Sequence, residues 1–256
     1  MPSPQLTRRL LSSALTLWLR SQVERVEHLQ VEIVGSDRQI WSGHIPDVSL
    51  QASEVVYSGL TLSDVRLVAK RIRVNLGQIV RGQPLRLLEV VPVQVEVVLS
   101  AVDLGRSLQS ELGRQALADL FRQIFRQIGA ALPGLPLIPQ EALASLQFHQ
   151  PQVMLGGDRL TISGMVQLNH LAAAGDMEMS VCLDTELTVL DGNRLCLTDC
   201  VVTTDRAATG EPVAHKAAID KLVINLGTDI AIQSLTISAN GMICCGQINV
   251  YTPAEP

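Results

Sequence analysis

A β-hairpin pattern recurs along this chain and constrains its fold more than any other feature. An alternating apolar strand, a turn with Gly and Asp, a second strand and a Ser-Gly pair occur at Gln30–Ile45 and again at Gln152–Val166. Looser copies occupy Val189–Cys200 and Leu235–Val250. One hairpin cannot bury its own apolar face, so the copies predict a large antiparallel sheet. The question for function is what covers that sheet.

The composition limits what such a sheet can recognise. Hydrophobic residues make up 47% of the 256 residues but aromatic residues only 3%, so the interior must be aliphatic. Recognition of bases relies on aromatic stacking platforms, and pockets for sugars also use aromatic side chains. A net charge of −5 is unfavourable for binding a phosphate backbone. The sequence therefore argues against nucleic acid as a partner.

The chain contains no linker-like or low-complexity run, and we expect one domain over residues 1–256. At its start, Ser3 can cap a helix and Pro4 suits the first helical position. The apolar residues that share one face of this helix are Leu6, Leu10, Ala14 and Trp18. The pattern predicts an amphipathic helix from about residue 4 to residue 26. An export signal is the alternative, because Arg8 and Arg9 precede a short apolar run, although a small-x-small cleavage site is missing.

Alternation of apolar and polar residues predicts strands over about residues 28–99. In one of them the apolar residues occupy odd positions within Val65–Ala69 and even positions within Ile72–Leu76. The change of parity at Lys70–Arg71 would turn the later side chains to the opposite face unless one extra residue is absorbed. We therefore expect a β-bulge at this point.

A long helix is predicted over about residues 102–129. Apolar residues recur every four positions from Leu104 to Ile128, Ser100 can begin a capping box, and Gly129 ends the pattern. A second set of strands is predicted over about residues 146–251. Its segment Met177–Val189 would extend about 43 Å, close to the length of about 40 Å expected for the helix. These elements predict an α+β fold in which a long curved antiparallel β-sheet wraps around one or two long amphipathic helices.

Motifs for catalysis and metal binding are missing from the sequence. The five histidines form no H-x-x-x-H or H-E-x-x-H pair, and there is no G-x-S-x-G elbow, Walker loop or dinucleotide-binding glycine fingerprint. We expect no enzyme activity, no metal and no cofactor other than a bound lipid. The cysteines fall in strand-like segments, where they are expected to be small buried hydrophobic residues; a metal or disulfide role is the alternative. They are Cys182, Cys196, Cys200, Cys244 and Cys245.

Five segments together resemble a known family. They are the hairpin motif at Val31–Gly43, I-P-D-V-S-L-x-A at Ile45–Ala52, G-L-x-L-S-x-V-x-L at Gly59–Leu67, I-R-V-N-L-G at Ile72–Gly77 and N-L-G-T-D-I-A-I-Q-S-L-T at Asn225–Thr236. With these motifs, nearly the whole chain resembles the LmeA-like phospholipid-binding family of bacterial domains. The resemblance implies a fold similar to one half of the tubular lipid-binding proteins, in which a curved sheet wraps a long helix and leaves an apolar groove for acyl chains.

The cellular location has two readings. Reduced thiols and the absence of a clear export signal favour the cytoplasm or the inner face of a membrane. The resemblance implies the cell envelope or periplasm, because the best-described members of the family carry an export signal and act there.

A lipid groove needs aliphatic walls and few directional polar groups, and the alternating strands and the long helix supply candidates for them. The candidate groove residues are Val31, Ile33, Leu50, Leu67, Val95, Leu108, Leu112, Leu120, Ile124, Met177, Met179, Val181 and Leu183. The candidates for contact with a lipid head group or membrane are Arg8, Arg9, Trp18, Arg122, Arg126, Leu135 and Leu137. The last two belong to a Pro-rich apolar stretch that can equally pack on the core.

We therefore expect noncatalytic binding of a phospholipid or another acyl lipid, extending to transfer, with peripheral association at a membrane surface. A structural or scaffold protein of the envelope, with no lipid groove, is the alternative. A hydrolase acting on a hydrophobic substrate is a third hypothesis, but no nucleophile and base can be named for it.

Overall fold

The computed structural model of this chain describes residues 15–79 except Trp18, and residues 86–128, 138–171, 175–205 and 215–251. The strands are β1 (His28–Val34), β2 (His44–Tyr57), β3 (Leu60–Arg73), β4 (Val91–Ser100), β5 (Gln147–Gly156), β6 (Arg159–Leu171), β7 (Gly175–Leu190), β8 (Arg194–Asp205), β9 (His215–Asn225), β10 (Ile230–Ser238) and β11 (Gly241–Val250). The helices are α2 (Asp37–Trp41), α3 (Leu76–Ile79), α4 (Ala101–Gln109), α5 (Glu111–Ile128) and α6 (Gln140–Ala144).

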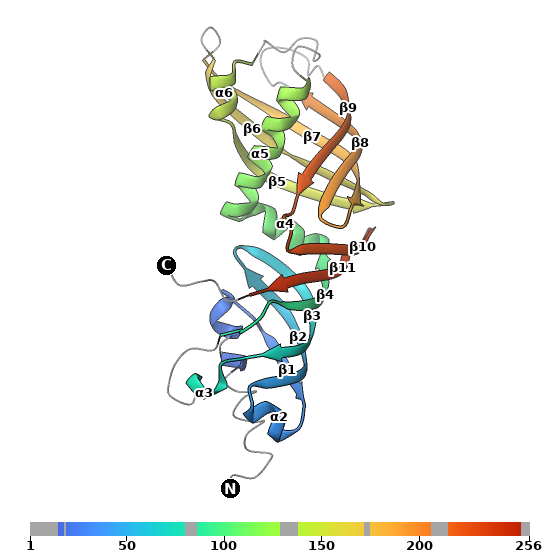
Figure 1. The fold of residues 1–256 in the computed structure, drawn as a ribbon. Coiled ribbons are helices and arrows are strands. Elements are labelled where there is room, and N and C mark those ends of the chain that lie inside the picture. The colour runs from blue at the N-terminus through green and yellow to red at the C-terminus, as the bar shows by residue number, and fades with distance from the viewer. Residues whose placement is uncertain are drawn as a thin grey trace.

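The strands form two open antiparallel sheets, one in each half of an elongated molecule (Figure 1). The first has the order β1-β2-β3-β4-β11-β10 and the second the order β5-β6-β7-β8-β9. The chain builds four strands of the first sheet, crosses through α4, α5 and α6, builds the whole second sheet and returns with β10 and β11. The expectation of one long sheet is wrong, because the helical crossover begins a new sheet where β4 ends.

Three of the four predicted hairpins are confirmed as the antiparallel pairs β5–β6, β7–β8 and β10–β11. The fourth, predicted at Gln30–Ile45, is wrong because α2 lies between β1 and β2. The backbone N–H of Ser36 donates to the side chain of Gln39 over 3.1 Å, and Ile40 is fully buried, so this single helical turn is both capped and anchored. The two strands still pair, with Val31 opposite Leu50.

The N-terminal helix ends earlier than the sequence predicts. Residues 15–17 and 19–22 are helical, and the remainder of the predicted span before them lies outside the described residues. After Gln22 the chain extends instead of continuing as a helix to residue 26: Arg25 accepts a hydrogen bond of 2.8 Å from Val56 N, and Glu24 N donates to Val56 O. Pairing with the end of β2 therefore terminates this helix.

The predicted β-bulge at Lys70–Arg71 is also wrong, although the change of parity is real. The register between β2 and β3 is constant through this region, with Ile45 opposite Ile72 and Asp47 opposite Lys70. Between these pairs, Pro46 lies opposite Arg71. Pro46 has no N–H to donate to the ladder, and the φ of Arg71, 55°, lies in the left-handed region. Because both strands change parity at the same place, no extra residue is needed.

The helix predicted over residues 102–129 is two helices. Ser100 caps α4 as predicted, accepting a hydrogen bond of 3.1 Å from Asp103 N. Ser110 ends α4 and then caps α5, since its Oγ accepts from Gly113 N over 3.1 Å. A Cβ at Gly113 would lie 2.1 Å from the carbonyl oxygen of Ser107, so the close approach at this break requires glycine.

The larger core lies between α5 and the second sheet. Phe121 and Ile124 of α5 are fully buried, as are Met179 and Leu183 of β7. Phe121 stacks on Phe148 of β5 with a ring-centroid distance of 4.9 Å. In the described residues this half of the molecule is therefore a densely packed helix-on-sheet layer.

Polar contacts attach helix α4 to the first sheet. Ser107 Oγ accepts a hydrogen bond of 2.8 Å from Thr61 N of β3, and the Asp103 carboxylate accepts from the hydroxyls of Ser63 and Ser100. Burial alone would raise the pKa of Asp103, but these hydroxyls and Arg106 outweigh it and lower the pKa. The ionised carboxylate therefore stabilises the attachment of α4 to the first sheet.

Candidate functional site

An apolar cavity of about 200 Å³ lies against one face of the first sheet. Strands β2, β3, β4 and β11 contribute most of its wall, and the helical residues Leu15 and Leu19 face the same space together with Leu87. The described residues that line it are Leu15, Leu19, Ile45, Val48, Leu50, Leu67, Ala69, Ile72, Val74, Leu87, Val91, Val93, Ile248 and Val250. Every one of these side chains is aliphatic, and almost no polar atom faces the cavity.

The register of the sheet explains why these residues meet. Val48 lies opposite Ala69, Ala69 opposite Val93, and Val93 opposite Ile248, so one row of small and medium side chains crosses four strands. Cross-strand partners point to the same face of a sheet. Ala69 is the smallest member of the row. Its short side chain leaves space that the larger side chains beside it do not leave.

The joint change of parity described above extends the wall. Ile45 and Ile72 are paired beyond Pro46 and Arg71, and both line the cavity together with the residues before the change. Without it, the side chains at the two ends of these strands would point to opposite faces. The wall is thus longer than a regular alternation would allow.

The chemistry of this cavity favours hydrocarbon over water. A buried water needs two to four polar partners, whereas aliphatic side chains offer none. An apolar group in the cavity gains the transfer free energy of leaving water, about 0.8 kcal/mol for each buried methylene.

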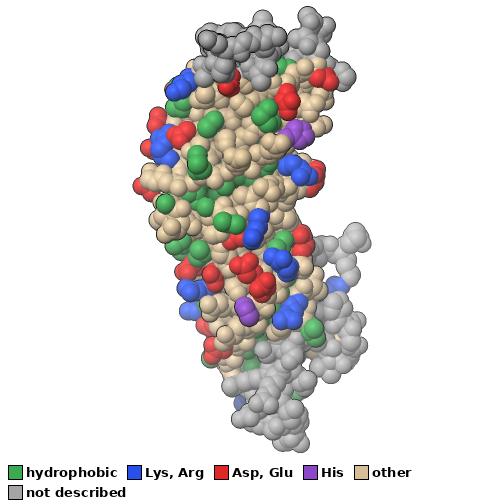
Figure 2. Space-filling model, turned by 180° about the vertical axis from the view of Figure 1, so that it is seen from behind, with side chains coloured by type: hydrophobic (Ala, Val, Ile, Leu, Met, Phe, Trp, Pro, Cys, Tyr) green, Lys and Arg blue, Asp and Glu red, His purple; other side chains and the backbone are tan. Residues whose placement is uncertain are grey.

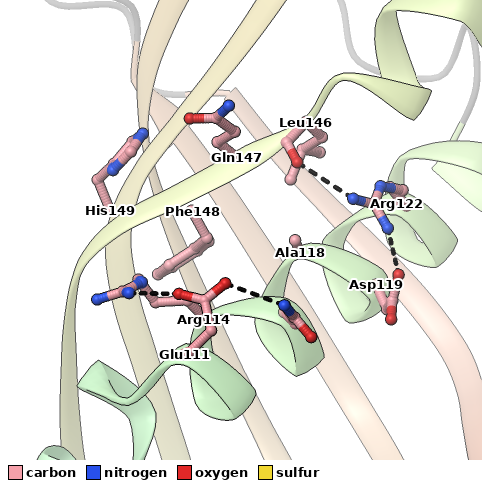
Figure 3. A pocket seen from close by; sticks show the side chains of 10 residues that line it. Glu111, Arg114, Ala118, Asp119, Arg122, Leu146, Gln147, Phe148 and His149 are labelled. Carbon is pink, nitrogen blue, oxygen red and sulfur yellow. Dashed lines mark hydrogen bonds and ion pairs between the residues drawn. The ribbon is translucent and has the colours of Figure 1, made fainter.

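A second depression, a cleft of about 560 Å³ between α5 and β5, is polar (Figure 3). Glu111 accepts hydrogen bonds from Arg114 over 2.6 Å and Gln115 over 2.9 Å, and these bonds lower the pKa of Glu111. The Nε2 atom of His149 is buried without a hydrogen-bond partner among the described residues. Glu111 pairs with Arg114 and Asp119 with Arg122, so the charged side chains of this cleft balance one another and it carries no excess of one charge.

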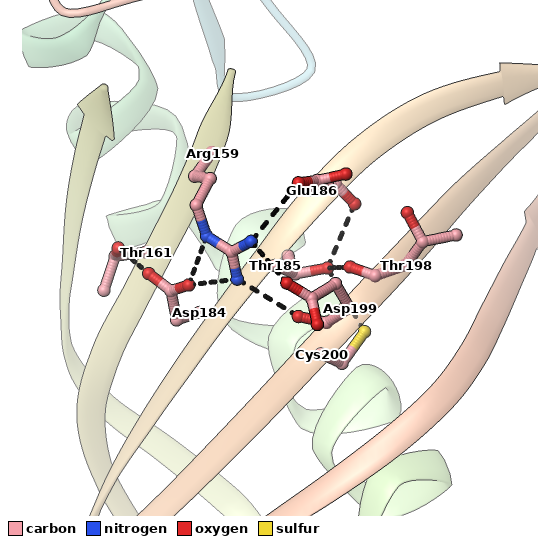
Figure 4. Close-up of polar contacts among 8 residues, drawn as sticks. All are labelled: Arg159, Thr161, Asp184, Thr185, Glu186, Thr198, Asp199 and Cys200. Carbon is pink, nitrogen blue, oxygen red and sulfur yellow. Dashed lines mark hydrogen bonds and ion pairs between the residues drawn. The ribbon is translucent and has the colours of Figure 1, made fainter. Parts of the chain in front are cut away.

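Polar residues on the second sheet form one further network, centred on Arg159 (Figure 4). Its guanidinium donates to Asp184 over 2.5 Å and to Asp199 over 2.7 Å, and lies 3.4 Å from Glu186. These hydrogen bonds raise the pKa of Arg159. The network bridges β6, β7 and β8 where the β7–β8 register shifts between Asp184 and Glu186, so its role is to hold an irregular part of the sheet.

A family model described as LmeA-like phospholipid-binding matches residues 5–247, nearly the whole chain. The chain belongs to the LmeA-like phospholipid-binding family. Comparisons with curated proteins and with solved structures gave no match. The family description names phospholipid as the ligand of the family.

The structure of this LmeA-like protein brings part of the predicted groove together. Leu50 and Leu67 line the cavity, and Val31, Ile33 and Val95 pack against the cluster of buried residues around it. The other lining residues, among them those of β11, were not selected from the sequence. Their signal was present, because Ile248 and Val250 alternate with polar residues, but alternation does not show which strand lies next to which.

The remaining groove candidates lie in the other half of the molecule. Ile124, Met177, Met179, Val181 and Leu183 are buried in the core between α5 and the second sheet. Leu108 and Leu120 pack against that core, and Leu112 is exposed. These side chains contact one another and do not line the apolar cavity.

The head-group candidates are similarly divided. Arg122 is engaged by the protein itself: its guanidinium donates to the carbonyl oxygens of Leu143 over 3.1 Å and Leu146 over 3.3 Å and pairs with Asp119. Arg126 is exposed on α5 and does not line the apolar cavity. The candidates outside the described residues are Arg8, Arg9, Trp18, Leu135 and Leu137.

Metal and thiol chemistry has little support in the described parts of the chain. No group of three or more His, Cys, Asp or Glu side chains there is arranged to hold a metal ion. The cysteines are free, and burial raises the pKa of Cys182, Cys200 and Cys244. Among the helices that the structure describes, none is both long enough and apolar enough to cross a bilayer.

Proposed function

We propose that this LmeA-like protein binds a phospholipid by inserting part of an acyl chain into the apolar cavity of the first sheet, without chemical change to the lipid. The observation that carries the proposal is the wall of 14 aliphatic side chains around unfilled space. The second half of the molecule, in contrast, has its apolar surface filled by α5. The family description supports lipid as the ligand and binding as the activity.

The size of the cavity sets the scale of binding. A water molecule occupies about 30 Å³ of liquid, and a methylene is of similar size, so 200 Å³ accepts roughly six or seven methylenes. At about 0.8 kcal/mol each, their burial contributes about 5 kcal/mol. Part of an acyl chain can therefore be held without directional polar contacts, while the head group and the rest of the lipid remain outside.

Mass spectrometry of gently isolated protein tests the proposal. We expect co-purifying phospholipid, and we expect the lipid-free protein to extract a labelled phospholipid from vesicles. Extraction followed by release to acceptor vesicles would extend binding to transfer. Protein that carries no lipid and extracts none would contradict the proposal, and a stoichiometric protein partner in its place would favour a scaffold role.

A further inference from the structure

Five large hydrophobic side chains at one end of the first sheet are more than half exposed. They are Val34 (55%), Trp41 (51%), Leu88 (57%), Val90 (59%) and Tyr251 (53%), and we refer to them as the rim. Single exposed hydrophobic residues are ordinary on protein surfaces. On the face shown in Figure 2, for example, hydrophobic side chains lie singly among acidic and basic ones. The rim differs because its members share one end of one sheet.

Backbone contacts place the first part of the rim. Trp41 ends α2, and two residues later Gly43 O accepts a hydrogen bond of 2.9 Å from Val74 N. Leu88 N donates over 2.9 Å to the carbonyl oxygen of Arg73, the last residue of β3. Helix α2 and the segment around Leu88 therefore lie at the end of the sheet where β2 begins and β3 ends.

The same end includes the remaining rim residues. Val34, the last residue of β1, is paired with Asp47 near the start of β2. Val91, the first residue of β4, is paired with Val250, the last residue of β11. This antiparallel register places their neighbours Val90 and Tyr251 beside each other. Adjacent strands are about 4.8 Å apart, so the rim extends over the width of several strands, roughly 20 Å.

Three rim residues are next to cavity-lining residues along the chain. Leu87 and Val91 line the cavity while their neighbours Leu88 and Val90 are exposed, and Val250 lines it while Tyr251 is exposed. The same chain segments thus present one side chain to the cavity and the next to solvent. The rim therefore lies at the end of the sheet, beside the cavity wall and outside it.

The composition of the rim points to a bilayer as the surface that it meets. Trp and Tyr are the residues enriched where protein meets the membrane interface, because their rings are partly apolar and partly polar. This chain has only two tryptophans and two tyrosines, and one of each stands on the rim among aliphatic side chains. A long-chain phospholipid resides in a bilayer, so its acyl chain would reach the cavity from such a surface.

We propose that the rim is the surface by which the protein docks on a lipid bilayer, with this end of the first sheet directed toward the membrane. This proposal rests on lipid binding in the cavity as its reason, but its test is separate. Docking by these five side chains would be peripheral and reversible.

Trp41 provides a direct probe. A Trp18→Phe variant of the full-length protein leaves Trp41 as the single tryptophan. With phosphatidylcholine vesicles we expect its emission to shift to the blue and to be quenched by lipids brominated on their acyl chains. Unchanged emission in the presence of vesicles would overturn the proposal.

A pair of substitutions tests the rim as a surface. Leu88→Asp combined with Val90→Asp should reduce partitioning into phosphatidylcholine vesicles at least tenfold in a flotation assay. Met154→Asp is the matched control, because Met154 is 65% exposed on the second sheet, and it should partition like the wild type. Equal partitioning of the wild type and the double variant would overturn the proposal, as would a wild-type dimer in solution that the double variant abolishes.

Binding of a short-chain phospholipid below its critical micelle concentration separates this proposal from the proposed function. The monomeric lipid reaches the cavity without a vesicle, so the double variant should bind it with the wild-type affinity. If vesicle partitioning depends on the rim but no monomeric lipid is bound, docking stands and binding in the cavity fails. If monomeric lipid is bound and the wild type ignores vesicles, the cavity stands and docking is overturned.

Discussion

Ala69→Phe should abolish lipid binding by filling the cavity from its own wall. Ala69 is the smallest side chain in the row that joins Val48, Val93 and Ile248 across four strands. Phenylalanine adds about six carbon atoms, close to the roughly six or seven methylenes that the cavity accepts. The substituted ring would therefore occupy the space that we assign to the acyl chain.

The magnitude follows from the same volume. Complete loss of the buried methylenes would remove about 5 kcal/mol of binding free energy. If the lipid makes partial contacts elsewhere, only half of this binding free energy is lost. A loss of about 2.5 kcal/mol raises the Kd roughly 60-fold. Overpacking of the wall can lower the stability of the protein by about 1–3 kcal/mol, so binding is to be measured well below the unfolding temperature.

Displacement of a fluorescent fatty-acyl probe by phospholipid measures the Kd, and circular dichroism shows that the variant is folded. Val68→Phe is the matched control: Val68 is the neighbouring residue on β3, does not line the cavity and is 36% exposed. We expect Val68→Phe to bind within twofold of the wild type. A folded Ala69→Phe protein with wild-type affinity would refute the assignment of the acyl chain to this cavity.

Three further predictions concern the rest of the fold. Gly164→Ala should destabilise the protein by about 1–3 kcal/mol in urea unfolding, because its Cβ would lie 2.4 Å from the ring of Phe148, whereas Gly156→Ala, with no atom within 4 Å of its Cβ, should be nearly neutral. Asp103→Asn should cost about 1.5–3 kcal/mol at pH 7. Folding lowers the pKa of Asp103 from 3.8, so the stabilisation by its carboxylate is complete above that pH and is lost as the pH falls through the lower pKa of the folded state. The variant lacks this carboxylate, so its stability should depend less steeply on pH below 3.8. Burial raises the pKa of Cys200, so iodoacetamide at pH 8 should alkylate it at least tenfold more slowly in the native protein than in urea.

Each of these predictions has an outcome that contradicts it. Equal unfolding midpoints for the two glycine variants would mean that the β5–β6 contact is looser than described. An unchanged acid transition in Asp103→Asn would show that another carboxylate governs the loss of stability at low pH. Alkylation of Cys200 at the same rate in native and unfolded protein would show that its thiol is accessible.

Local signals in the sequence predicted local structure well. Turn residues fixed three hairpins, and Ser100 marked the start of α4 because a cap depends on residues only three positions apart. The break at Ser110 was missed because apolar residues continue at a four-residue spacing across it. Only the close approach of the backbones at Gly113 shows why the helix ends.

The site was harder to predict than the elements, for a physical reason. Leu67 and Met179 lie in strands with the same alternation, yet Met179 is fully buried against α5 while Leu67 borders open space. Alternation shows which side chains share a face of a sheet, but it does not show how completely another element covers that face. Among the described residues, Leu15 and Leu19 face the first sheet across the cavity, whereas α5 packs closely on the second sheet.

A photoactivatable phospholipid with a diazirine near the end of one acyl chain tests the location of bound lipid most directly. After irradiation of the complex and peptide mass spectrometry, we expect adducts in residues 45–50, 67–74, 91–93 and 248–250, the strand segments that line the cavity. Excess unlabelled phospholipid should suppress them. Adducts confined to α5 and the second sheet, or scattered over the surface without competition, would contradict an acyl chain in the first sheet.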